Sequence, residues 1–382
     1  MSNQSTCPYA KKCGGCQLQN MDYERQLRFK QGKVIKYLGR YHRVEPIIGM
    51  EHPYHYRNKV QAAFGLTRSR RIVSGVYQAS SHTIVNVDSC LIEDQTADAI
   101  IVDIRRMLPD FRIVPYNEDS GQGFLRHVLV KRGFASGQVM VVLVGAAPVF
   151  PTKKAFTKAL LQSHPEITTV VFNINPHHTS MLLGEREEVL YGDGFIEDTL
   201  CGCVFRISPR SFYQINPVQT EKLYGIAMDY AGLTGKETVL DAYCGVGTIG
   251  LVAASRAGQV IGVELNADAV RDAKANARRN GIHNAAFRQG DAGEFMTALA
   301  EEGGKIDTVF MDPPRAGSDV PFLKSLCRLK PNRVVYISCN VETQSRDLRY
   351  LTTHGYRVKK IQPVDMFPHT NHVETVVFMT RG

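Results

Sequence analysis

Strand-like and helix-like segments alternate along the chain from about residue 206 to its end. The strand-like runs are TVLDAY, VIGVEL, AAFRQGD, DTVFMDPP and RVVYISC, followed by YRVKKIQPVDMF and VETVVFMT. Strands that are separated by helices pair in parallel, and the helices then cover both faces of the sheet. We therefore predict a Rossmann-like α/β domain over residues 206–382, with a parallel sheet and a C-terminal antiparallel hairpin.

The first half of the chain has a different pattern. Residues 21–39 form a basic run with apolar residues at helical spacing. From about residue 56 to 150, alternating runs such as VQAAFGL and GFLRHVLVKRG are separated by Gly, Ser and Asp, which is typical of strands. We predict a strand-rich α+β domain over residues 1–205, with helices at 21–39 and 152–163. The first of these helices could pack on the second domain.

The composition is that of a globular protein with excess positive charge. Of the 382 residues, 43% are hydrophobic and 22% are charged, and the net charge is +9. Such a chain suits a polyanionic partner, with nucleic acid as the first candidate. The N-terminus, MSNQSTCPYA, lacks the features of an export signal, so a cytoplasmic protein is expected. Nine cysteines in that compartment favour metal binding or nucleophilic chemistry over disulfides.

The stretch VLDAYCGVGTIGL, residues 239–251, has the pattern of a strand, a glycine-rich turn and the start of a helix. Gly245, Gly247 and Gly250 match the G-x-G-x-x-G dinucleotide fingerprint, and Glu264 ends the next strand. NAD is therefore one candidate ligand. Asp241, just before the turn, would repel a pyrophosphate but could support a loop beside a cationic ligand. That feature favours S-adenosylmethionine.

Acidic residues follow three strands of this domain, at Glu264, Asp291 and Asp312. Ligands bind at the carboxyl ends of strands in such a sheet. Glu264 could accept hydrogen bonds from both ribose hydroxyls, Asp291 could accept from the adenine amino group, and Tyr243 offers an aromatic face or a hydroxyl. Each acid taken alone could be an exposed loop residue, but three acids after a glycine turn favour a donor site.

The strand-like run VVYISCN, residues 334–340, ends at Cys339, and Glu374 begins the last strand-like run. Cys339 could be a core cysteine, but it falls at the carboxyl end of a strand beside the predicted donor site. An unpaired carboxylate inside an apolar strand is costly to bury, so Glu374 requires a function. A thiol and a carboxylate beside a methyl donor indicate methylation of a pyrimidine at C5. The thiolate would add to C6, and the carboxylate would remove the C5 proton.

The motifs SCN, DMFPHTNHVE, MDPPR, DAYCGVG and SFYQINP together resemble those of the bacterial RNA uridine-C5 methyltransferases, especially the iron–sulfur branch that acts on 23S ribosomal RNA. The resemblance covers nearly the whole chain. It implies that Cys339 is the nucleophile and Glu374 the base. It also implies methyl-donor contacts by Gln214, Tyr243, Glu264 and Asp312, with Asp291 matched more loosely. Phe212 could hold the flipped base or could be a core aromatic.

The resemblance also accounts for three cysteines near the N-terminus. In the iron–sulfur branch the pattern is C-x5-C-G-G-C with a distant fourth cysteine, which matches Cys7, Cys13, Cys16 and Cys90. Four thiolates can hold a [4Fe-4S] cluster. Zinc is the alternative, although structural zinc sites usually have two C-x2-C pairs, and here there is one. A structural or RNA-positioning role is expected for the cluster.

These features predict a monomeric enzyme that uses S-adenosylmethionine to make 5-methyluridine in 23S ribosomal RNA. Cations of the strand-rich domain would form a phosphate track; they are Arg57, Lys59, Arg68, Arg70, Arg71, Arg126, Lys131 and Arg132. Larger relatives carry an additional RNA-binding β-barrel, so here RNA docking is expected to fall to this domain. Two alternatives stay open: an amino-group methyltransferase that uses the DPPR motif, and a non-catalytic iron–sulfur protein that binds RNA.

Overall fold

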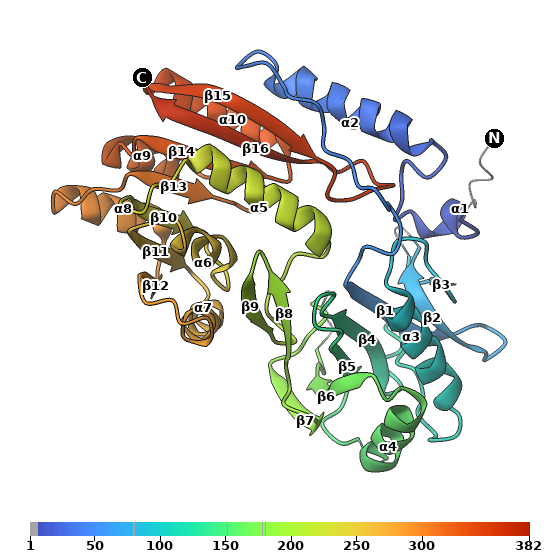
Figure 1. Cartoon of the computed structure of the whole chain (residues 1–382). Helices are drawn as coiled ribbons and strands as arrows, with labels where there is room; N and C mark the ends of the chain where they lie inside the picture. Colours follow the sequence, from blue (N-terminus) through green and yellow to red (C-terminus); the bar gives the residue numbers. More distant parts are fainter. Residues whose placement is uncertain (1–6, 79–80, 151, 178, 180) are drawn as a thin grey trace. The chain divides into compact units, whose positions relative to one another are not determined.

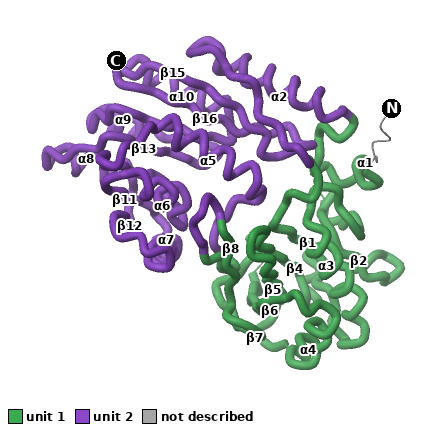
Figure 2. Tube along the Cα trace, viewed as in Figure 1, with its two compact units in different colours: residues 1–20, 53–199, 206–210 green, residues 21–52, 200–205, 211–382 purple. Residues whose placement is uncertain are grey.

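The computed structural model describes residues 7–78, 81–150, 152–177, 179 and 181–382. The chain divides into two compact units (Figure 2). Unit 1 comprises Met1–Asn20, Pro53–Thr199 and Arg206–Arg210, and unit 2 comprises Met21–His52, Leu200–Phe205 and Ser211–Gly382. Residues 206–210 therefore belong to unit 1 and residues 21–52 to unit 2, whereas the sequence analysis put a single boundary after residue 205.

Unit 1 is built on a seven-stranded sheet with the order β3-β2-β1-β4-β5-β6-β7 (Figure 1). Neighbouring strands are antiparallel except β5 and β6, which are parallel. The strands are Lys59–Leu66 (β1), Ile72–Tyr77 (β2), Ile84–Asn86 (β3), Leu125–Arg132 (β4), Val139–Gly145 (β5), Ile167–Ile174 (β6) and Arg186–Tyr191 (β7). A separate hairpin pairs β8 (Ile196–Leu200) with β9 (Cys203–Ile207). The predicted strand-rich N-terminal domain is confirmed.

The helices of unit 1 are α1 (Ala10–Cys13), α3 (Gln95–Met107) and α4 (Lys153–Ser163). Helix α3 lies inside the region that was predicted to be strand-rich, and the sequence analysis did not predict it. Its N-terminus is capped by Asp94, which accepts a hydrogen bond from the Ala97 amide. Ile100, Ile101 and Ile104 then join the core of the sheet. These β-branched residues also suit strands, so the helical spacing and the cap, not residue type, identify the helix.

Unit 2 contains a seven-stranded mixed sheet with the order β12-β11-β10-β13-β14-β16-β15. The strands are Thr238–Ala242 (β10), Gln259–Glu264 (β11), Ala285–Gln289 (β12), Thr308–Met311 (β13), Arg333–Ser338 (β14), Tyr356–Val364 (β15) and Glu374–Arg381 (β16). Strands β10 to β14 are parallel, and β16 runs antiparallel to both β14 and β15. This is the predicted parallel sheet with a C-terminal antiparallel hairpin.

Helices cover both faces of this sheet (Figure 1). Helices α5 (Pro217–Ala231), α6 (Thr248–Ala254) and α7 (Ala267–Arg279) lie on one face. The other face shares an apolar core with α2 (Tyr23–Leu38), α8 (Ala292–Glu301), α9 (Val320–Leu329) and α10 (Val341–Thr353). Val34 and Leu38 bring α2 into this core. None of the described helices is long and apolar enough to cross a lipid bilayer.

Candidate active site

The pairing of β14 with β16 determines where the predicted nucleophile and base lie. Ser338 at the end of β14 is opposite Thr375 in β16. Cys339 follows Ser338 and Glu374 precedes Thr375, so both residues lie just beyond the last pair, and Glu374 is close enough to raise the pKa of Cys339. Asp312 follows β13, the neighbour of β14. The sheet therefore brings together three predicted site residues that are far apart in the sequence.

The pKa values of these three groups are raised, mainly by burial, so each group holds its proton to a higher pH than it would in water. Burial, and to a smaller extent the charge of Asp312, raise the pKa of Glu374 to about 8. Burial also raises the pKa of Asp312 to about 7. The Cys339 thiol, which is half-buried, has its pKa raised to about 11 by burial and by Glu374 and Asp312. Strongly shifted carboxyl groups beside a thiol are typical of a catalytic site.

Arg315 supplies the opposing positive charge. Its charge lowers the pKa of both Glu374 and Cys339, and a hydrogen bond from its side chain lowers that of the thiol further. The guanidinium also lies 3.3 Å from Nε2 of His372, whose pKa is lowered by burial and then by Arg315. The sequence analysis gave Arg315 and His372 no role. Their places in the MDPPR and HVE motifs, beside Asp312 and Glu374, were the available signal.

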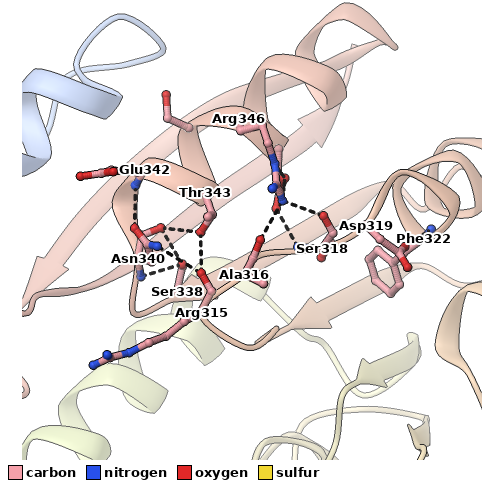
Figure 3. A network of polar contacts seen from close by, with 12 residues as sticks. Arg315, Ala316, Ser318, Asp319, Phe322, Ser338, Asn340, Glu342, Thr343 and Arg346 are labelled. Atoms are coloured by element: carbon pink, nitrogen blue, oxygen red, sulfur yellow. Dashed lines mark hydrogen bonds and ion pairs between the residues drawn. The ribbon is translucent and has the colours of Figure 1, made fainter.

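Asn340 and Thr343, which follow Cys339 in the sequence, fix the backbone of Arg315 (Figure 3). Asn340 Nδ2 and Thr343 Oγ1 donate hydrogen bonds to the Arg315 carbonyl oxygen at 3.1 and 3.2 Å. Asn340 also caps α10 by accepting from the Glu342 amide. The guanidinium points away from this network (Figure 3). The segments that carry the thiol and its neighbouring cation are therefore held together by direct hydrogen bonds.

The turn between β10 and α6 forms a polar cradle at the carboxyl end of the sheet. Tyr243 has φ +64°, a conformation that is strained for a tyrosine and often found at binding sites. The Gly245 amide donates to Glu264 Oε2 at 3.1 Å, and the Gly250 amide donates to Asp241 Oδ2 at 2.7 Å. Gly247 (φ +84°) has no room for a side chain, because a Cβ would lie 2.9 Å from the Phe287 ring.

Only one of the two carboxylate oxygens of Asp241 is hydrogen-bonded to the glycine turn. Within the described part of the chain, its buried Oδ1 has no hydrogen-bond partner. Burial, with smaller contributions from Asp312 and Glu264, raises the pKa of Asp241 to about 8. An unpartnered buried carboxylate oxygen among other acids fits a cationic ligand better than a pyrophosphate. This observation agrees with the choice of S-adenosylmethionine over NAD.

The other predicted donor contacts lie around this cradle. The Tyr243 ring packs against Phe322, and its hydroxyl donates to Ser318 Oγ at 3.4 Å. Gln214 contacts the buried hydroxyl of Tyr224. Asp291 is exposed and caps α8 by accepting from the Glu294 amide at 2.9 Å, while lining a cavity of about 500 Å³ between α8 and α9. The exposed Phe212 lies two residues before Gln214.

Comparisons with known proteins show which family the chain belongs to. The family model for tRNA (Uracil-5-)-methyltransferase matches residues 196–382. An uncharacterized RNA methyltransferase of Clostridium acetobutylicum is 45% identical over 385 residues, which cover 99% of this chain and 84% of that protein. The crystal structure of Pyrococcus abyssi tRNA (uracil-54, C5)-methyltransferase in complex with S-adenosyl-L-homocysteine is 30% identical, with a TM-score of 0.80. That match covers 96% of this chain and 86% of the Pyrococcus chain.

The chain belongs to the RNA (uracil-C5)-methyltransferase family. It is an S-adenosylmethionine-dependent enzyme that acts on RNA, as its motifs indicated. This membership favours carbon methylation over the amino-methylating alternative.

The methyltransferase gathers three of its four predicted metal-binding cysteines near the N-terminus. Cys7, Cys13 and Cys16 lie close enough for Cys7 and Cys13 to raise the pKa of Cys16, which burial brings to about 12. Cys90 shares a charged neighbour with Cys13 and Cys16, because the charge of Glu93 raises the pKa of all three thiols. Across the described ranges, no three His, Cys, Asp or Glu side chains form a group that could hold a metal ion.

Arg57 tests whether these cysteines suit an anionic cluster. Its positive charge lowers the pKa of Cys13 and Cys16. Its Nε–H is buried and has no acceptor among the described residues. A cluster whose sulfur atoms accept hydrogen bonds and whose net charge is negative would satisfy both features. The positive charge and the unpartnered N–H of Arg57 therefore suit a negatively charged group beside Cys13 and Cys16.

The predicted phosphate track is wrong for several of its cations. Arg126 is buried and pairs with Glu118, Lys131 is buried and donates to the Ser208 carbonyl, and Arg132 pairs with Asp94. These side chains stabilise unit 1 because each has a protein partner. Three of the predicted cations are exposed. They lie in the hairpin between β1 and β2 and are Arg68, Arg70 and Arg71.

Proposed function

We propose that the methyltransferase methylates C5 of a uridine through covalent addition of Cys339 to C6, with Glu374 as the base. The observation that supports the proposal is the register of β14 and β16, whose last pair, Ser338 and Thr375, adjoins both residues. Arg315 favours the thiolate form that must attack. Asp312 lies close enough to influence both catalytic groups.

The reaction divides into three steps. The Cys339 thiolate adds to C6, and the electron pair of the C5=C6 bond moves to C5 and its neighbouring carbonyl. C5 then attacks the methyl carbon, and the bond from that carbon to the sulfonium sulfur breaks. The Glu374 carboxylate removes the C5 proton, the C5=C6 bond reforms, and the thiolate leaves C6. Glu374 must be ionised for this last step, although its pKa of about 8 keeps much of it protonated at neutral pH.

S-adenosylmethionine supplies an electrophilic methyl group on a positively charged sulfur. We assign its binding to Gln214, Tyr243, Glu264, Asp291 and Asp312, around the cradle formed by the glycine turn. The free Oδ1 of Asp241 and the raised pKa values of Asp241 and Asp312 support this assignment, because a nearby cation would stabilise the ionised acids.

We assign Cys7, Cys13, Cys16 and Cys90 to an iron–sulfur cluster of the [4Fe-4S] type, with zinc as the competing metal. The positive charge of Arg57, which lowers the pKa of Cys13 and Cys16, supports the assignment. These residues belong to unit 1, whereas Cys339 and Glu374 belong to unit 2. A structural or RNA-positioning role is therefore proposed for the cluster.

The proposed substrate is a uridine in 23S ribosomal RNA, from the motifs shared with the iron–sulfur branch. A tRNA uridine is the second candidate, because the Pyrococcus abyssi structure and the matching family model both carry tRNA names. Incubation of the enzyme with labelled methyl donor and either purified 23S RNA or tRNA separates the two. Label in 5-methyluridine from 23S RNA alone is expected, and label in tRNA alone would contradict the ribosomal assignment.

Trapping with RNA that contains 5-fluorouridine tests the mechanism. Fluorine at C5 cannot be removed as a proton, so the covalent adduct should persist. Cys339→Ala should abolish it. Cys327→Ala, at a half-buried cysteine of α9 in the same unit, serves as the matched control and should retain it. Normal trapping by Cys339→Ala, or none by the parent enzyme, would contradict the proposal and restore the amino-methylating or non-catalytic alternatives.

A further inference from the structure

Unit 1 contains a cavity of about 470 Å³ that the proposed reaction does not use. Its volume lies within the range of sites for small organic groups, ~300–1,000 Å³. Phe64 of β1 and Val73 of β2 line it and are buried. Tyr77 and His82 add two aromatic rings, whose centroids are 6.0 Å apart. We call this cavity the Tyr77 pocket.

A second set of residues gives the Tyr77 pocket a carboxylate edge. Glu118 and Asp119 line it from the segment that precedes β4. Glu118 is held by Arg126, which donates from Nε and Nη2 at 3.0 and 2.8 Å. The Arg126 side chain is only 1% exposed and donates as well to the carbonyls of Asn175 and His177. The position of the Glu118 carboxylate is therefore fixed by a buried network.

Asp119 completes this edge at the surface. Its Oδ1 lies 2.7 Å from Nδ1 of His82. The two side chains are 75% and 62% exposed, so the pair remains open to a ligand. Carboxylates recognise groups that present N–H donors, such as the amino groups of nucleobases. The pocket thus combines aromatic faces with acceptors for an amino-bearing ring.

Positive charge stands beside this acidic pocket. Thr67 and Arg68 of the β1–β2 hairpin line the cavity, and the exposed Arg70 and Arg71 follow them. The hairpin is closed by hydrogen bonds from the Arg70 amide to the Thr67 carbonyl and from the Thr67 amide to the Arg71 carbonyl, at 2.8 and 2.9 Å. Within the described residues, these three guanidinium groups have no ion-pair partner. An aromatic pocket next to free cations is the arrangement that binds single-stranded nucleic acid.

We propose that the Tyr77 pocket binds an unpaired guanine of the substrate RNA, with the neighbouring phosphates on the 67–71 hairpin. Guanine suits it best because N1–H and the exocyclic amino group lie side by side and can both donate to carboxylate oxygens. Uracil has a single N–H on that edge and two carbonyl groups that carboxylates repel. The proposal rests on the proposed function only in taking RNA as the ligand. It adds a second recognition point, distinct from the uridine that is methylated.

Fluorescence anisotropy with the full-length protein tests this assignment. The probes are two labelled RNA heptamers, one of uridines only and one with a central guanosine. The parent protein should bind the guanosine probe more tightly. Tyr77→Ala should weaken binding of that probe by about tenfold, the order of one base–aromatic stack. Tyr191→Ala, at an exposed tyrosine of β7 in the same unit, is the matched control and should have no effect.

Two further variants separate the base contact from the phosphate contact. Asp119→Asn changes an exposed side chain and should remove the preference for guanosine without weakening the uridine probe. Combined Arg68→Ala, Arg70→Ala and Arg71→Ala should weaken both probes alike and reduce the salt dependence of binding. Equal guanosine preference in the parent, Tyr77→Ala and Asp119→Asn proteins would overturn the proposal. A second result would also overturn it: an oligo-arginine peptide binds the parent protein but not Asp119→Asn, while Asp119→Asn binds RNA as the parent does. The pocket would then serve a protein partner.

Trapping with 5-fluorouridine RNA distinguishes failure of the pocket proposal from failure of the catalytic proposal. With saturating RNA, Tyr77→Ala should still form the 5-fluorouridine adduct, because Cys339 is unchanged, and only the RNA concentration that half-saturates trapping should rise. Absence of any adduct in the parent enzyme would contradict the catalytic proposal and leave the guanosine preference standing. A normal adduct with no guanosine preference would contradict the pocket alone.

Discussion

Ionisation of Glu374 should limit the last step of the proposed reaction. The pKa of this carboxyl is about 8 because it is buried and faces Asp312. Methyl transfer converts the sulfonium to a neutral thioether, so the donor no longer stabilises the carboxylate when the C5 proton must leave. Below this pKa the ionised fraction falls about tenfold for each pH unit, so adduct breakdown should be about 100-fold slower at about pH 6 than on its alkaline plateau.

A rapid-quench experiment measures this step directly. Enzyme, methyl donor and a uridine-containing RNA are mixed, and the protein–RNA adduct is counted over time between about pH 6 and pH 9.5. Adduct decay should rise with pH and level off above about pH 8. Arg315→Met should shift the midpoint upward, because Arg315 lowers the pKa of Glu374. Decay that is independent of pH across this range would refute the role of Glu374 as the base.

Further predictions concern stability, the metal and the adduct. Glu374→Gln should let the adduct form and stall its release. Because burial raises the pKa of Glu374 from 4.5 to about 8, its ionisation opposes folding as the pH rises between these values. The same variant should therefore melt at a higher temperature than the parent near pH 8 and at the same temperature near pH 4, and equal melting at both would contradict the burial argument. Lys30 and Asp365 form a fully buried ion pair at 2.6 Å, so Lys30→Met should cost about 3–5 kcal/mol in chemical denaturation, and adding Asp365→Asn should recover part of the loss. Anaerobic preparations should contain about four irons per chain and lose most of them in Cys90→Ser, whereas stoichiometric zinc would overturn the metal assignment.

The sequence predicted the catalytic domain well because its signals are local. Alternating strands and helices specify a parallel sheet, and the glycine turn at residues 239–251 marks where β10 passes into α6. Cys339 and Glu374 were predicted as nucleophile and base from their positions at strand termini. Their proximity depends on the register of β14 against β16, although the two residues are 35 positions apart along the chain. No local pattern contains that register.

Electrostatic surroundings were harder to predict. Arg126 and Arg132 looked like candidates for phosphate binding because the sequence does not show which residue an arginine in a strand will pair with. Folding brings Glu118 and Asp94 to them. The same limit hid the role of Arg315, whose effect on Cys339 depends on turns that meet only in the folded unit. Residue type predicts charge, but the tertiary contacts decide whether that charge is free.

The most direct test of the proposed chemistry is to identify the residue that carries the RNA. The 5-fluorouridine adduct would be digested with protease and nuclease and analysed by mass spectrometry. We expect the nucleotide mass on the peptide that contains Cys339, joined through its sulfur to C6 of the pyrimidine. Attachment to any other cysteine, with Cys339 recovered unmodified, would contradict the account.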